Sequence, residues 1–193
     1  MKKIWLLVLA LFFIGVTAVS ADDIWEPEPA ELNAVTLSDL FSWGDDIEYV
    51  HQVLRDYDYF FTKIERIEDA GNPVIVYSGE NGYGQFAYSF LFTKEGGKLW
   101  KTQTIDIYMM GSSGEKEFDS ICKEMGVDEL EPYDRAVIDD ILPAEDLEKL
   151  FAAADETTIY WGGYDSNNRY SEQGDTVFFT RIDREYYEAE RDS

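Results

Sequence analysis

The sequence predicts an α+β fold: an antiparallel sheet of about five or six strands, with two or three helices packed on one face. Runs of alternating aromatic and β-branched residues, separated by short turn signals, predict the strands. Apolar residues at helical spacing before and after these runs predict the helices. With 193 residues, of which 45% are apolar, the chain is long enough to bury a core of its own.

The start of the chain has the features of an export signal. Lys2 and Lys3 form a basic beginning, an apolar run covers 4–16, and small residues precede a cut after Ala21. The run is too short to persist as a membrane anchor. An uncleaved membrane helix is the alternative. We therefore expect residues 1–21 to be a signal peptide, and the mature protein to be secreted or periplasmic without a stable membrane anchor.

Three further regions follow in the mature chain. Residues 22–36 combine acidic residues with two prolines and predict a charged, extended tether. Residues 37–183 are expected to form one α+β domain, and 184–193 a charged tail that frays or continues as a short helix. The coarse order of helices and strands also fits two tandem α/β halves, which stays open as an alternative.

The first helix is predicted over 45–56, because Ile47, Val50 and Leu54 fall on one helical face. Asp45 or Asp46 is expected to cap this helix by accepting hydrogen bonds from the N–H groups of its first turn. Three or four strands are predicted next, at 60–68, where the alternation is imperfect, and at 73–78, 85–93 and 99–108, with Asn81-Gly82 as a hairpin turn.

Alternation in the third of these strands puts four aromatic residues on one face: Phe86, Tyr88, Phe90 and Phe92. A second helix is predicted from Ser112 to Gly126, with an apolar stripe of Phe118, Ile121, Cys122 and Met125. A third helix is predicted from Pro143 through Ala154. Two last strands, at 157–164 and 175–182, are joined by a polar loop.

Short motifs in this order resemble a group of small exported bacterial domains. They are Phe41-Ser42-Trp43-Gly44 before an amphipathic helix, then Ala87-Tyr88-Ser89-Phe90 and Gly97-Lys98-Leu99 in a meander. In general plan these domains look like the β-lactamase inhibitor protein and the small outer-membrane-assembly lipoprotein domain. The resemblance covers about residues 37–125, and 127–155 departs from it. It implies helices on one face of an antiparallel sheet and a protein-binding role, with no catalytic residues to transfer.

One cysteine and one histidine limit the chemistry of the chain. Cys122 lies in an apolar helical stripe, so we expect it to pack in the core, and a lone cysteine cannot form an intramolecular disulfide. His51 is expected on the core-facing edge of the first helix. A zinc site or a Ser-His-Asp triad would need more such residues, and no Gly-x-Ser-x-Gly motif is present. We predict no catalytic residues and no cofactor.

A loop near the end of the chain offers a candidate calcium site. Asp165, Asn167 and Asp175 could supply oxygen ligands, although the spacing of an EF-hand is broken by Tyr170 at its glycine position. The paired carboxylates Asp45-Asp46 and Asp139-Asp140 keep a small carboxylate- or metal-dependent hydrolase of the cell envelope open as an alternative function. Adjacent aspartates at helix starts are more often caps.

Five aromatic residues are candidate binding residues because they fall on or near turns: Tyr83, Tyr160, Trp161, Tyr164 and Tyr170. Their alternative role is to cover the sheet. The net charge is −24, or −26 once Lys2 and Lys3 are removed, which argues against nucleic acid and anionic lipid as partners. The sequence therefore predicts an exported, acidic, non-enzymatic binding module that recognises a neutral or basic protein or an envelope component.

Overall fold

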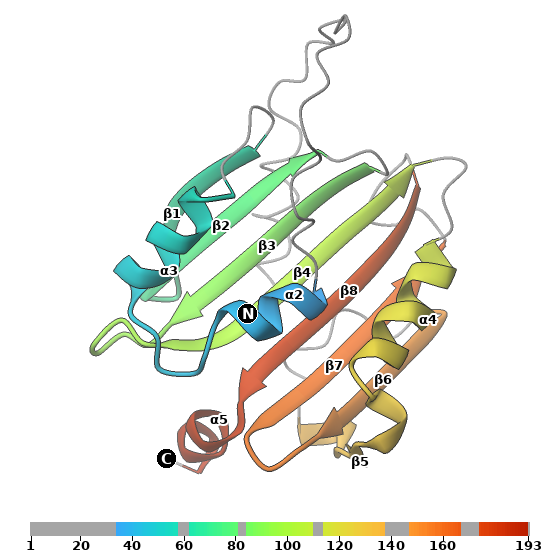
Figure 1. Cartoon of the computed structure of the whole chain (residues 1–193). Helices are drawn as coiled ribbons and strands as arrows, with labels where there is room; N and C mark the ends of the chain where they lie inside the picture. The colour runs from blue at the N-terminus through green and yellow to red at the C-terminus, as the bar shows by residue number, and fades with distance from the viewer. Residues whose placement is uncertain are drawn as a thin grey trace, which may run out of the picture.

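The computed structural model describes residues 34–57, 62–80, 84–109, 114–137, 147–166 and 174–192. It is an α+β protein with one antiparallel sheet, and helices α2, α3 and α4 lie on the same face of that sheet (Figure 1). We call this the front face and the opposite side the rear face. The helices are α2 (Ala34–Leu40), α3 (Ile47–Arg55), α4 (Gly114–Glu124) and α5 (Arg184–Arg191). The strands are β1 (Thr62–Asp69), β2 (Asn72–Glu80), β3 (Gly84–Phe92), β4 (Leu99–Met109), β5 (Glu131–Pro132), β6 (Lys149–Ala154), β7 (Thr158–Asp165) and β8 (Gly174–Asp183).

The sheet has eight strands in the order β1-β2-β3-β4-β8-β7-β6-β5. Strands β1 to β4 form one meander, β5 to β8 form a second, and the two join through their last strands, β4 and β8. Each meander follows a helix that packs on the front face (Figure 1). This order has the form expected of two tandem halves, the organisation that the sequence left open.

The predicted aromatic face of β3 is confirmed and forms the first half of the front core. Phe86, Tyr88, Phe90 and Phe92 are buried there together with Val50 and Leu54 of α3. The ring of Phe41, just after α2, meets Phe90 edge-on at 5.2 Å between centroids. Strict alternation along β3 therefore directs the large rings to the side where α3 covers them.

Helix α3 forms where a helix was predicted but begins two residues later, and neither aspartate caps it. Asp46 occupies the N-cap position with extended backbone, yet its side chain accepts no capping hydrogen bond and instead pairs with the Lys98 ammonium at 2.8 Å. The Asp45 carboxylate accepts from the backbone N–H of Ser42, outside the helix. The predicted cap is wrong because a lysine from the β3–β4 hairpin competes for the Asp46 carboxylate.

Helix α4 carries the predicted stripe and ends as predicted. Phe118 and Ile121 are buried against β7 and β8, and Cys122 packs on the same cluster. Burial raises the pKa of the Cys122 thiol to about 12, as expected of a core cysteine rather than a reactive one. Gly126 follows the helix with φ of 63°, a left-handed conformation that glycine adopts without steric cost.

The predicted third helix is wrong, because its second half is strand β6. Lys149–Ala154 pairs along its whole length with β7, and β5 pairs with its far end. Residues 150–154 are a short, uninterrupted apolar run, which periodicity alone cannot assign to a helix or a strand. Strands β5 and β6 raise the count to eight, above the five or six expected; Pro143 lies outside the described residues.

At the two ends of the domain, the start differs from expectation and the tail takes one of the two forms expected of it. Helix α2 begins at Ala34, three residues before the predicted start of folded structure. The charged tail forms α5 (Arg184–Arg191). Asp183 caps this helix, and its carboxylate accepts from the backbone N–H of Tyr186. Tyr187 of this helix packs on the rear face of the sheet. The tail is therefore part of the folded body.

Candidate functional site

The predicted aromatic patch is not assembled on turns. Tyr160, Trp161 and Tyr164 lie within strand β7, whereas Tyr83 and Tyr170 lie outside the described residues. Trp161 is 0% exposed and belongs to the rear core. Tyr164 is buried under α4 on the front face. The expected exposure is wrong for Trp161 and Tyr164, and Tyr160 is half-buried; the placement of all three favours the alternative that they cover the sheet.

Tyr160 and Tyr164 also use their hydroxyl groups within the fold. The Tyr160 hydroxyl donates to Asp155 Oδ2 at 2.9 Å, and the Tyr164 hydroxyl to Asp175 Oδ2 at 3.2 Å. Burial and the neighbouring Asp175 carboxylate raise the pKa of Tyr164 to about 12. Both hydroxyl groups are therefore already hydrogen-bonded to aspartates of this chain.

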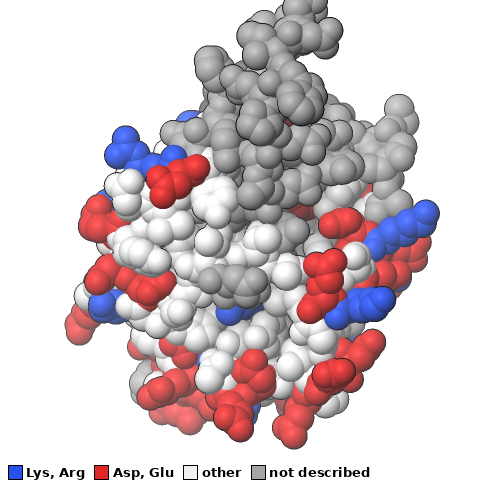
Figure 2. All heavy atoms as spheres, viewed as in Figure 1, with Lys and Arg blue, Asp and Glu red and all other residues white. Residues whose placement is uncertain are grey.

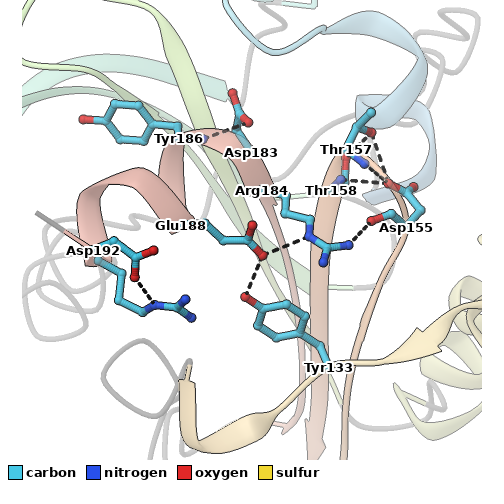
Figure 3. Close-up of polar contacts among 10 residues, drawn as sticks. Tyr133, Asp155, Thr157, Thr158, Asp183, Arg184, Tyr186, Glu188 and Asp192 are labelled. Atoms are coloured by element: carbon cyan, nitrogen blue, oxygen red, sulfur yellow. Dashed lines mark hydrogen bonds and ion pairs between the residues drawn. The ribbon is translucent and has the colours of Figure 1, made fainter.

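Asp155 organises the turn between β6 and β7. Its Oδ1 accepts from the backbone N–H groups of Thr157 and Thr158, each at 2.7 Å, and its backbone carbonyl accepts from Arg184 of α5 (Figure 3). Burial raises the pKa of Asp155, but the hydrogen bonds outweigh it and leave the pKa below its ordinary value. Arg184 also reaches Glu188 at 3.0 Å, so one network ties this turn to α5.

The described residues of the candidate calcium site are already engaged or buried. Asp175 accepts from Tyr164, and Asp165 is a buried residue at the end of β7. Asn167 lies outside the described residues. In the parts of the chain that the structure describes, no three His, Cys, Asp or Glu side chains gather to hold a metal ion. A calcium site at this loop stays a prediction.

His51 faces strand β1 rather than the core. Arg66 on β1 makes a two-pronged ion pair with Glu48, at 2.7 and 2.8 Å, and its Nη2 lies 2.8 Å from His51 Nδ1. The Arg66 guanidinium can donate a hydrogen bond to His51 Nδ1 only while that ring nitrogen carries no proton. The expected core-facing position is therefore wrong: His51 is half-buried because it packs beside Arg66.

Acid is expected to weaken the attachment of α3 to β1. Burial, and then the positive charges of Arg66 and Arg55, lower the pKa of His51 below its ordinary value. A lowered folded-state pKa gives stability that is present above the unfolded pKa, about 6.5, and lost as the pH falls through the folded pKa. We expect the melting temperature to fall more between about pH 7.5 and about pH 5.5 in the native protein than in His51→Gln. Equal falls in the two proteins would contradict this.

The rear face of the sheet was not singled out by the sequence. On strands β2 and β3, Val74, Val76 and Leu91 form a buried apolar cluster there. Within the described ranges, the apolar side chains packed against this cluster are Ile67 and Trp100, which also belong to strands β1 and β4. In the second half of the rear face, residues from outside the strands cover the sheet: Tyr133, Leu147 and Tyr187 pack on it.

Buried polar atoms without a hydrogen-bond partner collect on this rear face. Within the described part of the chain they include Trp161 Nε1 and Thr180 Oγ1, from cross-strand neighbours on β7 and β8 that are both 0% exposed. Glu65 Oε2 and Trp100 Nε1 are two more. Glu65 is paired with Val76, which places it on the same side as the apolar cluster. Such atoms are costly to leave unsatisfied, and a bound water or a further polar group can satisfy them.

A transverse row of polar side chains crosses the same face. Ser89 on β3 faces Gln103 on β4, which faces Thr180 on β8. All three are buried. The sequence does show the signal, as polar residues at alternate positions of strands rich in apolar residues, but only the strand order places them side by side.

Fold and site together define the class of this protein: an α+β domain on a single eight-stranded antiparallel sheet, with helices α2, α3 and α4 on one side and a mixed apolar and polar surface on the other. No described helix has the length and apolar character needed to cross a membrane. No protein-family model matches the chain, and no curated protein or solved structure matches it either.

Proposed function

We propose that this chain is an exported binding module that holds a protein partner on the rear face of its sheet. The observation that carries the proposal is the set of buried polar atoms on that face without a partner among the described residues, next to an apolar cluster whose described contacts all come from the sheet. A polypeptide supplies both apolar side chains and the carbonyl and N–H groups that such atoms require.

The expected mature chain offers two longer segments outside the described residues as candidate cover for this surface. Once residues 1–21 are removed, the longest segments outside the described residues are 22–33 and 138–146. Both are rich in acidic residues and neither contains a long apolar run. Charged segments of this kind are poor cover for a cluster of valine and leucine side chains.

The charge of the protein narrows the class of partner. The net charge is −24, and acidic side chains surround a largely uncharged centre on the front face (Figure 2). Like charges slow encounter and disfavour binding, so we expect a partner that is neutral or basic overall. This keeps the class expected from composition and moves the binding surface from the turns to the sheet.

Site-specific photo-crosslinking in the exported compartment tests the proposal. A benzoylphenylalanine at Ser78, a half-buried rear-face position on β2, is expected to form a discrete adduct with another protein. The matched control is Tyr49 on α3, which is 51% exposed on the other side of the molecule. Adducts from Tyr49 alone, equal adducts from both positions, or none from Ser78 would overturn the proposal.

A further inference from the structure

A β-bulge sets the direction of one lysine on the rear face. Leu91 pairs with Lys101, whereas the next residue, Phe92, pairs with Leu99, so Trp100 is the extra residue in β4. On its other side Lys101 pairs with Ile182. Leu91 and Ile182 both belong to the rear core, and side chains of paired residues share a face. Lys101 therefore lies on the rear face, between the two apolar clusters.

Lys101 is a buried cation between two apolar cross-strand neighbours. The residue is 3% exposed, and its cross-strand neighbours Leu91 and Ile182 are both buried. Among the described residues, no carboxylate lies within ion-pair distance of its ammonium and no hydrogen bond holds it. Burial lowers the pKa of Lys101 to about 8, and the attraction of Asp69 opposes this only in part.

A charge in such a place is costly unless an opposite charge and hydrogen bonds compensate it. Folded proteins therefore rarely keep a lysine fully buried without a partner group. Hydrophobic residues of similar length would fill this position between Leu91 and Ile182 at lower cost. The position is understandable when a ligand brings the compensating charge.

We propose that the protein partner held on the rear face places the carboxylate of an Asp or Glu side chain against Lys101. This inference rests on the proposed function and adds the chemistry of contact. The carboxylate would sit on a segment with apolar residues on either side, because Leu91 and Ile182 flank Lys101 across the strands and Val74 lies beyond Leu91. The partner is then neutral or basic overall, with one acidic residue at the centre of its contact.

Selection of a random heptapeptide display library on the exported chain tests this without knowledge of the partner. We expect selected peptides to be enriched in Asp or Glu flanked by apolar residues. Lys101→Met should abolish this enrichment and weaken a selected peptide by roughly 30-fold or more, the range for removing one side of a buried charge pair. Lys123→Met is the matched control, since Lys123 is an exposed lysine of α4 on the front face; it should retain the enrichment.

Thermal melting separates lost binding from lost folding. Lys101→Met removes a buried, uncompensated charge, so its melting temperature should equal or exceed that of the native protein. Peptides without an acidic preference, or an acidic preference that persists in Lys101→Met, would overturn the inference. If the Ser78 adduct still forms in that case, the proposed function stands alone; if neither peptides nor the adduct appear, both fail.

Discussion

Trp161→Ala is expected to lower the free energy of unfolding by about 3–5 kcal/mol, the usual cost of truncating a large aromatic in a core. The indole is fully buried among Ile159, Phe178 and Ile182 on the rear side of β7 and β8. Its removal leaves a cavity that the sheet cannot close, because strands on both sides hold β7 in register. Chemical denaturation followed by far-ultraviolet circular dichroism measures the loss.

Trp161→Phe is the matched control for this prediction. It keeps a ring in the space, and the indole N–H that it removes has no hydrogen-bond partner among the described residues. We therefore expect it to lose at most about half as much stability as Trp161→Ala. An alanine variant that unfolds at the same denaturant concentration as the native protein would show that Trp161 is exposed. It would then again be a candidate binding residue.

Much of the first half of the fold was predictable, because local signals and the final structure agree there. Alternation alone identified the buried rings of β3, including Tyr88 and Phe90, and Gly126 marked the end of α4. Each of these signals lies within a few residues and depends on backbone periodicity. No knowledge of distant strands is needed to interpret them.

The second half was less predictable because its assignment depends on distant partners. Residues 150–154 become a strand because β7 pairs with them, a fact that their own apolar character does not contain. Trp161 looks like an exposed anchor beside a loop until the rear core is known to cover it. Likewise, Asp46 is a good cap by composition, but Lys98 takes its carboxylate from across the hairpin.

The candidate site was missed for a related reason. Ser89, Gln103 and Thr180 are far apart in the sequence, and only the join between β4 and β8 brings them into one row. From the sequence alone, Lys101 is indistinguishable from a surface lysine in a strand that is polar at alternate positions. The bulge at Trp100 and the burial around it are tertiary features, so they could not be predicted from a single sequence.

Gly162→Ala is expected to destabilise the protein by about 1–3 kcal/mol, the range for forcing extra atoms into a packed core. A Cβ at this position would lie 2.5 Å from Phe151 Cε1 and 3.1 Å from Phe179 Cδ2. Both rings pack on the front face, Phe179 with its centroid 5.8 Å from that of Phe151. The ring of Phe151, the cross-strand partner of Gly162, thus occupies the space that a side chain at position 162 would need.

A double-mutant cycle distinguishes this clash from a general intolerance of alanine in β7. Phe151→Leu shortens the side chain that the new methyl group would meet, so Gly162→Ala should cost less in that background than in the native one. Losses that simply add would contradict the close approach. Neighbouring residues of a strand point to opposite faces of the sheet. Trp161 therefore places a large indole in the rear core, while Gly162 places no side chain in the front core. The ring of Phe151, which pairs with Gly162, fills that space in the front core instead.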